Sequence, residues 1–118
     1  MRELFRHKKN TRALLVGDNS DVENIFDRPT IVSRADEAIL KIKTAREPFE
    51  VLVIDAVLPD SIQTGLDVIE QLREHETRTL KKTHTGFSPA TVIARSGAPV
   101  HRDVCLKTGA DIFEIKTN

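Results

Sequence analysis

Four side chains that could carry chemistry stand at the ends of short apolar runs in this sequence. Two are carboxylates, one is a hydroxyl and one is an ammonium: Asp18, Asp55, Ser96 and Lys116. Carboxylate oxygens are typical ligands of Mg²⁺, which usually takes one or two of them and keeps several waters. A carboxylate can also attack a phosphoryl group and form an aspartyl phosphate. The oxygens of that group then need cationic and hydrogen-bonding partners, which Lys116 and Ser96 could supply.

Each of these residues also has an ordinary structural interpretation. Asp18 and Asp55 could be turn residues or helix caps. Ser96 precedes Gly97 and could close a turn, and Lys116 could be a solvated side chain. The functional interpretation therefore depends on a fold that brings all four side chains together.

The apolar runs predict five strands. The most apolar of them, Val51–Ile54, suits a strand that is buried on both faces, as in a parallel sheet under helices. The predicted strands are Ala13–Val16, Thr30–Val32, Val51–Ile54, Thr91–Ala94 and Ile112–Ile115.

Segments with helical spacing alternate with these strands. The predicted helices are a brief one over Asp21–Phe26, two amphipathic ones over Arg34–Ala45 and Gly65–Glu76, and one from Pro99 to Gly109. Ser33 is the expected N-cap of the second, and Thr77–Ser88 is expected to be a polar loop, either alone or after a helical extension. The alternation predicts an α/β fold with a flavodoxin-like, doubly wound, five-stranded parallel sheet. The ends of parallel strands share one edge, so the four candidate residues are expected to converge there.

Composition limits the classes of function. The 118 residues suit one domain over residues 12–118, preceded by a basic extension over residues 1–11. Eighteen basic and eighteen acidic residues leave no net charge, which argues against nucleic acid or an anionic membrane as the main partner. No apolar run has transmembrane length. With a single cysteine, Cys105, the chain is expected in a reducing, cytoplasmic compartment.

Several short motifs follow one another in a fixed order. They are Leu14-Leu15-Val16-Gly17-Asp18, Val51-Leu52-Val53-Ile54-Asp55, Leu58-Pro59, Gly65-Leu66, Val92-Ile93-Ala94-Arg95-Ser96-Gly97, and Gly109-Ala110-Asp111 through Ile115-Lys116. No single motif is specific. In this order, from about Arg12 to Thr117, the chain resembles a response-regulator receiver domain of two-component signalling.

The resemblance implies a metal and phosphorylation site. Asp55 matches the phosphoacceptor, and Asp18 matches the carboxylate that binds Mg²⁺ directly. Val57 matches the position whose backbone carbonyl completes the metal site. Mg²⁺ is therefore the expected cofactor.

The resemblance also implies a switch. Ser96 matches the hydroxyl that reaches toward the phosphoryl group, and Lys116 matches the lysine of the family's site. Phe113 stands three residues before that lysine, at the position of the rotating switch aromatic, although packing in the core is the simpler interpretation of this residue.

Departures from the family pattern qualify this expectation. The family usually has an acidic pair after its first strand, and here the first member is Gly17, so metal affinity is expected to be weaker. Thr117 stands where the family usually has proline, so the family's cis peptide is not expected. The loop from Asp55 to Gly65 is about two residues longer than usual, and Thr77–Ser88 resembles an insertion.

The resemblance implies a signalling domain rather than an enzyme. Its partner would be a sensor histidine kinase or a phosphotransfer protein, which phosphorylates Asp55 and so changes partner binding. Gly17, Thr117 and the expected lack of a last helix favour an alternative, a pseudo-receiver that acts as an interaction or dimerisation module without phosphorylation.

Other classes fit less well. A haloacid-dehalogenase-type hydrolase would need a second catalytic aspartate where Val57 stands. No phosphate-binding loop of the Gly-x-x-x-x-Gly-Lys-Ser/Thr type precedes the strand that ends at Asp55. The five phenylalanines, without tyrosine or tryptophan, offer little for stacking a flavin ring.

One face of the predicted sheet lacks cover. The first helix is brief, and the sequence reaches Asn118 directly after the fifth strand, although in this topology the first and last helices cover the same face. An apolar face left open would be unusual for a monomer. Leu4 and Phe5 could fold back onto it, or a second copy or part of a longer protein could cover it. We expect a partner or self-association.

Overall fold

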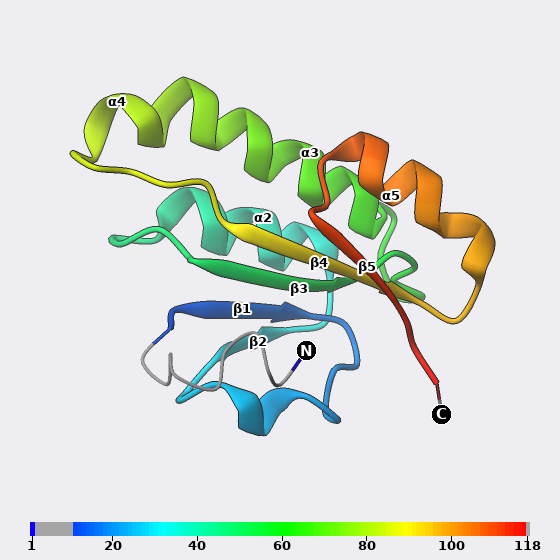
Figure 1. Ribbon diagram of the computed structural model, residues 1–118. Coiled ribbons are helices and arrows are strands. Elements are labelled where there is room, and N and C mark those ends of the chain that lie inside the picture. Colours follow the sequence, from blue (N-terminus) through cyan, green and yellow to red (C-terminus); the bar gives the residue numbers. More distant parts are fainter. Residues whose placement is uncertain (2–10, 118) are drawn as a thin grey trace.

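A parallel five-stranded sheet forms the centre of the computed structural model, which describes Met1 and residues 11–117 (Figure 1). The strands are β1 (Ala13–Val16), β2 (Thr30–Val32), β3 (Val51–Asp55), β4 (Thr91–Ser96) and β5 (Ile112–Ile115). They pair in the order β2-β1-β3-β4-β5, and every pair is parallel. The predicted flavodoxin-like fold is therefore confirmed.

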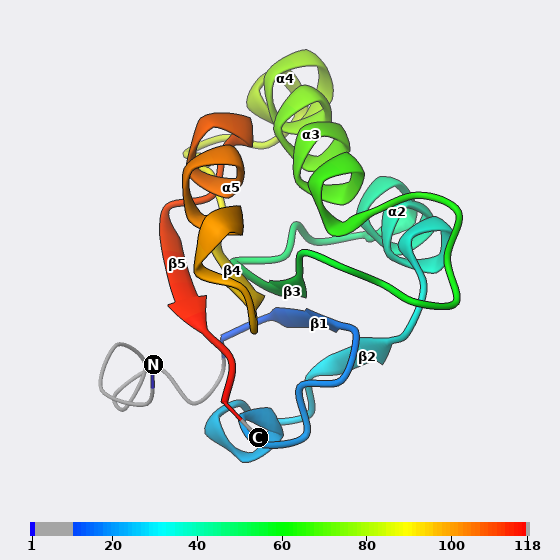
Figure 2. The same cartoon turned by 90° about the vertical axis from the view of Figure 1, so that its right-hand side faces the viewer.

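Helices cover one face of this sheet (Figure 2). They are α2 (Ala35–Thr44), α3 (Gly65–His75) with its continuation, and α5 (Arg102–Thr108), which follows a 3₁₀ turn at Pro99–His101. The α3 helix begins at a capping box in which Thr64 and Asp67 exchange hydrogen bonds. The α2 helix begins one residue later than predicted, because Glu37 accepts the backbone N–H of Arg34.

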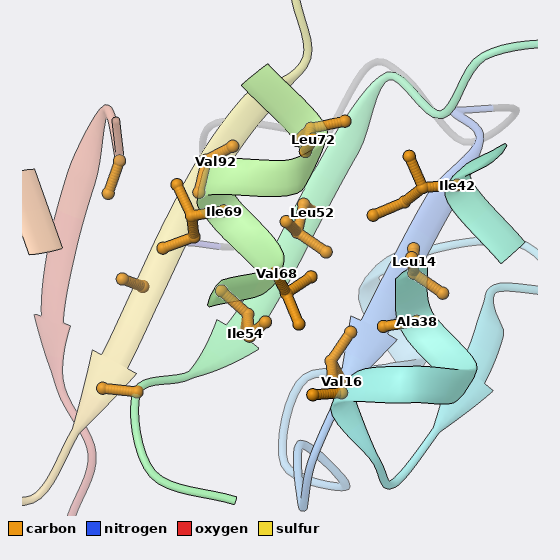
Figure 3. Packing of buried hydrophobic residues seen from close by; sticks show 14 of the residues in the cluster. Leu14, Val16, Ala38, Ile42, Leu52, Ile54, Val68, Ile69, Leu72 and Val92 are labelled. Carbon is orange, nitrogen blue, oxygen red and sulfur yellow. The ribbon is translucent and has the colours of Figure 1, made fainter. Parts of the chain in front are cut away.

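The main core lies between the sheet and these helices (Figure 3). Leu14, Leu52 and Val92 from three neighbouring strands face Val68 and Ile69 of α3, and all five are almost or fully buried. A leucine or isoleucine buried in this way contributes about 1.5–3 kcal/mol relative to the exposed side chain. This layer fixes the strand ends that position the candidate site.

Of the two alternatives for Thr77–Ser88, the structure has the helical extension, with a shorter loop after it. The chain stays helical from residue 76 to residue 83, first as a π-helix over Glu76–Leu80 and then as α4 (Lys81–Thr83). Leu80 is buried, and Glu76 is buried with its carboxylate paired to Arg73 and to the backbone N–H of Ala90. A buried, paired glutamate leaves no apolar repeat in the sequence, so periodicity missed this continuation.

The opposite face of the sheet also differs from expectation. The brief first helix is confirmed as one 3₁₀ turn, η1 (Glu23–Ile25), and no described residue after β5 forms a helix. Even so, Val53 and Ile93 on this face are fully buried. They belong to a second core cluster with Val22 and Phe26, which flank η1, and Met1 packs against it. Contrary to the expectation of an open face, these described side chains are covered, and the expected partner or self-association stays a prediction.

Part of the cover comes from the segment between β1 and β2. This segment is irregular, but its side chains Val22 and Phe26 pack against the strands on this face. The prediction that Leu4 and Phe5 cover this face lies outside the described residues, as does most of the predicted basic extension. Within Met1 and residues 11–117, no helix is long and apolar enough to cross a membrane, and every peptide bond, including the one between Lys116 and Thr117, is trans.

Candidate functional site

Three of the four candidate residues meet at the carboxyl edge of the sheet, Asp55 and Lys116 through their side chains and Asp18 through its backbone. Asp55 is the last residue of β3, and its Oδ2 lies 2.8 Å from Nζ of Lys116, which follows β5. The backbone N–H of Asp18, after β1, donates to the same oxygen at 3.1 Å. Lys116 also donates to the backbone carbonyl of Asp18. The predicted convergence of these strand ends is therefore present.

The second oxygen of Asp55 is left without a partner. Oδ1 is buried and makes no hydrogen bond to the described residues, while the side chain as a whole is 14% exposed. Leaving a buried acceptor unsatisfied costs about 1–3 kcal/mol, and more when the group is charged. The site thus contains an oxygen that a cation or a hydrogen-bond donor would satisfy.

Asp18 and Val57 complete an oxygen-rich set. The Asp18 side chain is exposed and accepts a hydrogen bond from the hydroxyl of Ser20 at 3.1 Å. Val57 is exposed beside Asp55 on the same pocket wall. Two carboxylates and one carbonyl are a donor set that fits Mg²⁺, which keeps several waters. The free Oδ1 of Asp55 supports this fit, although no group of three acidic, histidine or cysteine side chains gathers among the described residues.

Gly17 shapes the wall behind Asp55. A Cβ built on Gly17 would lie 2.4 Å from Asp55 Oδ2, closer than real Cβ atoms approach any atom. Its φ of +98° also belongs to the region that favours glycine. The position that carries an acidic side chain in the family is thus closed to any side chain in this conformation.

These residues line an open pocket of about 490 Å³ at the edge of the sheet. The volume lies within the usual range for small-ligand sites. The wall is made by Gly17, Asp18, Ser33, Asp55, Val57, Pro59, Asp60, Gly97 and Lys116.

Comparison with known proteins identifies the fold. No family model matches the sequence, and no curated protein matches it. Solved structures do match. One is a co-crystal of the yeast (Saccharomyces cerevisiae) phosphotransfer protein Ypd1 with the receiver domain of Ssk1, with TM-score 0.73, 18% identity, and 92% of this chain and 79% of that chain covered.

Two further structures agree. The receiver domain of the Francisella response regulator 1452 has TM-score 0.64 and 24% identity, with 91% of this chain and 84% of that one covered. The CheX-CheY-BeF₃-Mg complex from Borrelia burgdorferi gives TM-score 0.66 and 20% identity, with 92% and 79% covered. This chain has the fold of a response-regulator receiver domain.

Two further sequence-predicted residues, Ser96 and Phe113, are not among the residues that line this pocket. Ser96 ends β4, but its hydroxyl is hydrogen-bonded to Nδ1 of His101 at 2.7 Å and to the backbone N–H of Ala98 at 3.0 Å. Phe113 is partly buried and packs against the main core. The structure therefore groups Asp18, Asp55 and Lys116 with Val57, while Ser96 stands next to them with its hydroxyl engaged elsewhere.

Sequence reasoning missed a buried arginine, Arg95, which lies in β4 directly beside Asp55 of β3. The Arg95 side chain is 4% exposed and pairs with both oxygens of Asp21, at 2.9 and 2.6 Å. It also donates to Glu114 at 3.0 Å and to the buried Asn19 at 2.9 Å. The hydrogen bond from Arg95 lowers the pKa of the Asp21 carboxyl below its usual value.

This network ties the loop after β1 to β4 and β5 and so helps to fix the position of Asp18. The sequence contains a signal for this buried arginine and its partners. Arg95 follows Val92-Ile93-Ala94 within an otherwise apolar strand, and a charge in such a place needs a partner.

Proposed function

We propose that this domain accepts a phosphoryl group on Asp55 and changes its binding to a partner protein in response. The observation that carries the proposal is the state of the Asp55 carboxylate. Lys116 and the Asp18 amide hold one oxygen, and the other has no partner among the described residues, in an open pocket at the carboxyl edge of a receiver fold.

The proposed donor is a phosphohistidine on a kinase or phosphotransfer protein. An oxygen of Asp55 attacks the phosphorus, the P–N bond breaks, and its electron pair stays on the imidazole nitrogen of the donor. The yeast structure pairs a receiver domain with a histidine phosphotransfer protein. We extend that pairing to this chain as part of the proposal.

Lys116 has two tasks in this scheme. Before transfer its ammonium, 2.8 Å from Oδ2, orients the carboxylate. After transfer it is the cation placed to attract the phosphoryl oxygens. The Asp18 N–H adds a second donor to the same oxygen, and Lys116 in turn donates to the Asp18 carbonyl.

Asp18, Asp55 and the Val57 carbonyl would hold Mg²⁺, which when bound neutralises charge on the transferred group. Because Gly17 removes one acidic side chain from the site, we expect this ion to be held weakly. A phosphorylation assay therefore needs millimolar Mg²⁺ in excess.

The test is phosphorylation by a small donor. Purified protein is incubated with acetyl phosphate and excess Mg²⁺, and the intact mass is followed over time. The proposal expects the mass gain of one phosphoryl group, with Asp55→Asn unmodified and Lys116→Met strongly slowed. Equal labelling of wild type and Asp55→Asn would contradict it.

A second function, a pseudo-receiver that binds partners without phosphorylation, is favoured by Gly17. Its backbone is so close to Asp55 that a second acidic side chain has no room. A Mg²⁺ titration followed by amide NMR separates the two functions. Shifts confined to Asp18, Asp55 and Val57 support phosphorylation, and no saturable shift up to tens of millimolar supports the pseudo-receiver.

A further inference from the structure

The hydroxyl of Ser96 has two hydrogen-bond partners in the turn that follows β4. Its oxygen accepts the backbone N–H of Ala98 at 3.0 Å and lies 2.7 Å from Nδ1 of His101. A hydroxyl has a single proton to donate. When Nδ1 is unprotonated and accepts that proton, an acceptor oxygen at Asp55 has to compete with His101 for it.

The geometry of β4 explains this arrangement. Successive side chains of a strand point to opposite faces. Arg95 pairs with Asp21 in the segment between β1 and β2, and the next residue, Ser96, is hydrogen-bonded to His101 in the turn before α5. The 3₁₀ turn Pro99–His101 leads into α5 and brings the imidazole back over the end of β4.

Ser96 is also joined to the cation of the site. Its backbone carbonyl accepts the N–H of Lys116 at 2.9 Å, and the side chain of Lys116 holds Asp55. Ser96 thus lies between His101 and the Lys116–Asp55 pair. The hydroxyl that contacts His101 and the carbonyl that contacts Lys116 belong to the same residue. A movement of Ser96 at its hydroxyl therefore acts close to the backbone contact of Lys116.

We propose that His101 is a positioning residue that accepts the Ser96 hydroxyl proton on Nδ1 and holds the hydroxyl away from Asp55. Release of Ser96 from His101 is then a step in switching, and the strength of this bond sets how readily the domain responds. The inference rests on the proposed function, because it concerns the regulation of the same site.

The first test reads the imidazole itself and needs no phosphorylation. Long-range proton–nitrogen NMR at mildly alkaline pH, where histidine rings are generally neutral, reports which ring nitrogen carries the proton. We expect His101 to carry it on Nε2 in wild type and to lose this preference in Ser96→Ala. His84, whose Nδ1 lies 2.9 Å from Thr83 Oγ1, serves as an internal control and is expected to be unchanged.

The second test measures affinity for beryllofluoride, a phosphoryl mimic, in excess Mg²⁺. His101→Ala frees the hydroxyl and is expected to bind about three- to tenfold more tightly than wild type, the effect of one hydrogen bond. His101→Asn keeps an acceptor near the Nδ1 position and is expected to bind like wild type, as is His84→Ala. In the Ser96→Ala background, His101→Ala is expected to have no effect.

The outcomes separate the two proposals. A His101 proton on Nδ1, or a tautomer that Ser96→Ala leaves unchanged, overturns the positioning role whatever beryllofluoride does. Equal affinities of His101→Ala and His101→Asn, both above wild type, also overturn it, because loss of packing would then be the cause. If no variant binds beryllofluoride, the phosphorylation proposal fails, and the ring measurement still decides the role of His101.

Discussion

The ammonium of Lys116 lies 2.8 Å from Asp55 Oδ2 and also donates to the backbone carbonyl of Asp18. One cation therefore joins the ends of β5, β3 and β1. It leaves Asp55 Oδ1 as a buried oxygen without a partner among the described residues. This contact organises the candidate site, and variants of the residues that surround and support it test the account.

Substitution of Gly17 tests the wall behind Asp55. Gly17→Ala is expected to lower the free energy of unfolding by about 2 kcal/mol or more, because a positive φ and a contact with the Asp55 carboxylate act together. Gly86→Ala is the matched control. Gly86 also has a positive φ, +72°, but a Cβ there meets nothing within 4 Å, so about 1 kcal/mol is expected. Urea unfolding measures both, and equal losses would show that the Asp55 contact does not matter.

Acid stability tests the Asp21–Arg95 pair. Because Arg95 lowers the pKa of folded Asp21, the unfolded chain binds more protons between about pH 4 and that lower value. The pair therefore stabilises the fold above this window, and the contribution is lost as pH falls through it. Asp21→Asn is expected to be less stable at neutral pH and to lose stability less steeply below about pH 4.

The control for this measurement is Asp103→Asn, which removes a carboxylate whose side chain is 84% exposed. Unfolding by urea at several pH values gives the slope for each variant. If Asp21→Asn retains the slope of wild type, the pairing with Arg95 has no energetic consequence.

The helical continuation after α3 depends on Glu76. Glu76→Gln replaces a carboxylate that accepts from Arg73 at 2.8 Å and from the Ala90 N–H at 2.7 Å. A glutamine amide cannot accept at both ends, so a loss of about 1–3 kcal/mol in the free energy of unfolding is expected. Glu74→Gln breaks a largely exposed pair with Arg78 and should cost less than about 1 kcal/mol. Similar losses for the two variants would contradict the structural role of Glu76.

Cys105 provides a probe of the core under α5. The thiol is fully buried, and burial raises its pKa. We expect it to react slowly with a disulfide reagent in the native state at neutral pH and rapidly once urea unfolds the chain. Fast labelling of the native protein would show that α5 opens readily from the sheet.

Much of the fold could be predicted because short apolar runs bounded by turns describe parallel strands well. Val51–Ile54 is the clearest case, and it positions Asp55 without any other information. Because the carboxyl ends of parallel strands lie at one edge of the sheet, the contact of Asp55 with Lys116 could also be predicted, although the two residues are 61 positions apart in the sequence.

The remaining features depend on partners that no periodicity reveals. Arg95 and Glu76 are buried charges, and each is tolerated only because residues distant in sequence pair with it. The contact of Ser96 with His101 depends on the direction of one hydroxyl at the end of β4. The cover of the η1 face depends on Val22 and Phe26, two apolar residues in an irregular segment.

The central claim is that Asp55 itself accepts the phosphoryl group. Its most direct test is treatment with acetyl phosphate and Mg²⁺, followed by borohydride reduction, which converts an aspartyl phosphate to homoserine, and peptide mass spectrometry. The account predicts homoserine at position 55 in wild type and at no position in Asp55→Asn. Homoserine at another aspartate, or none in wild type when a receiver domain known to respond is labelled in parallel, would contradict it.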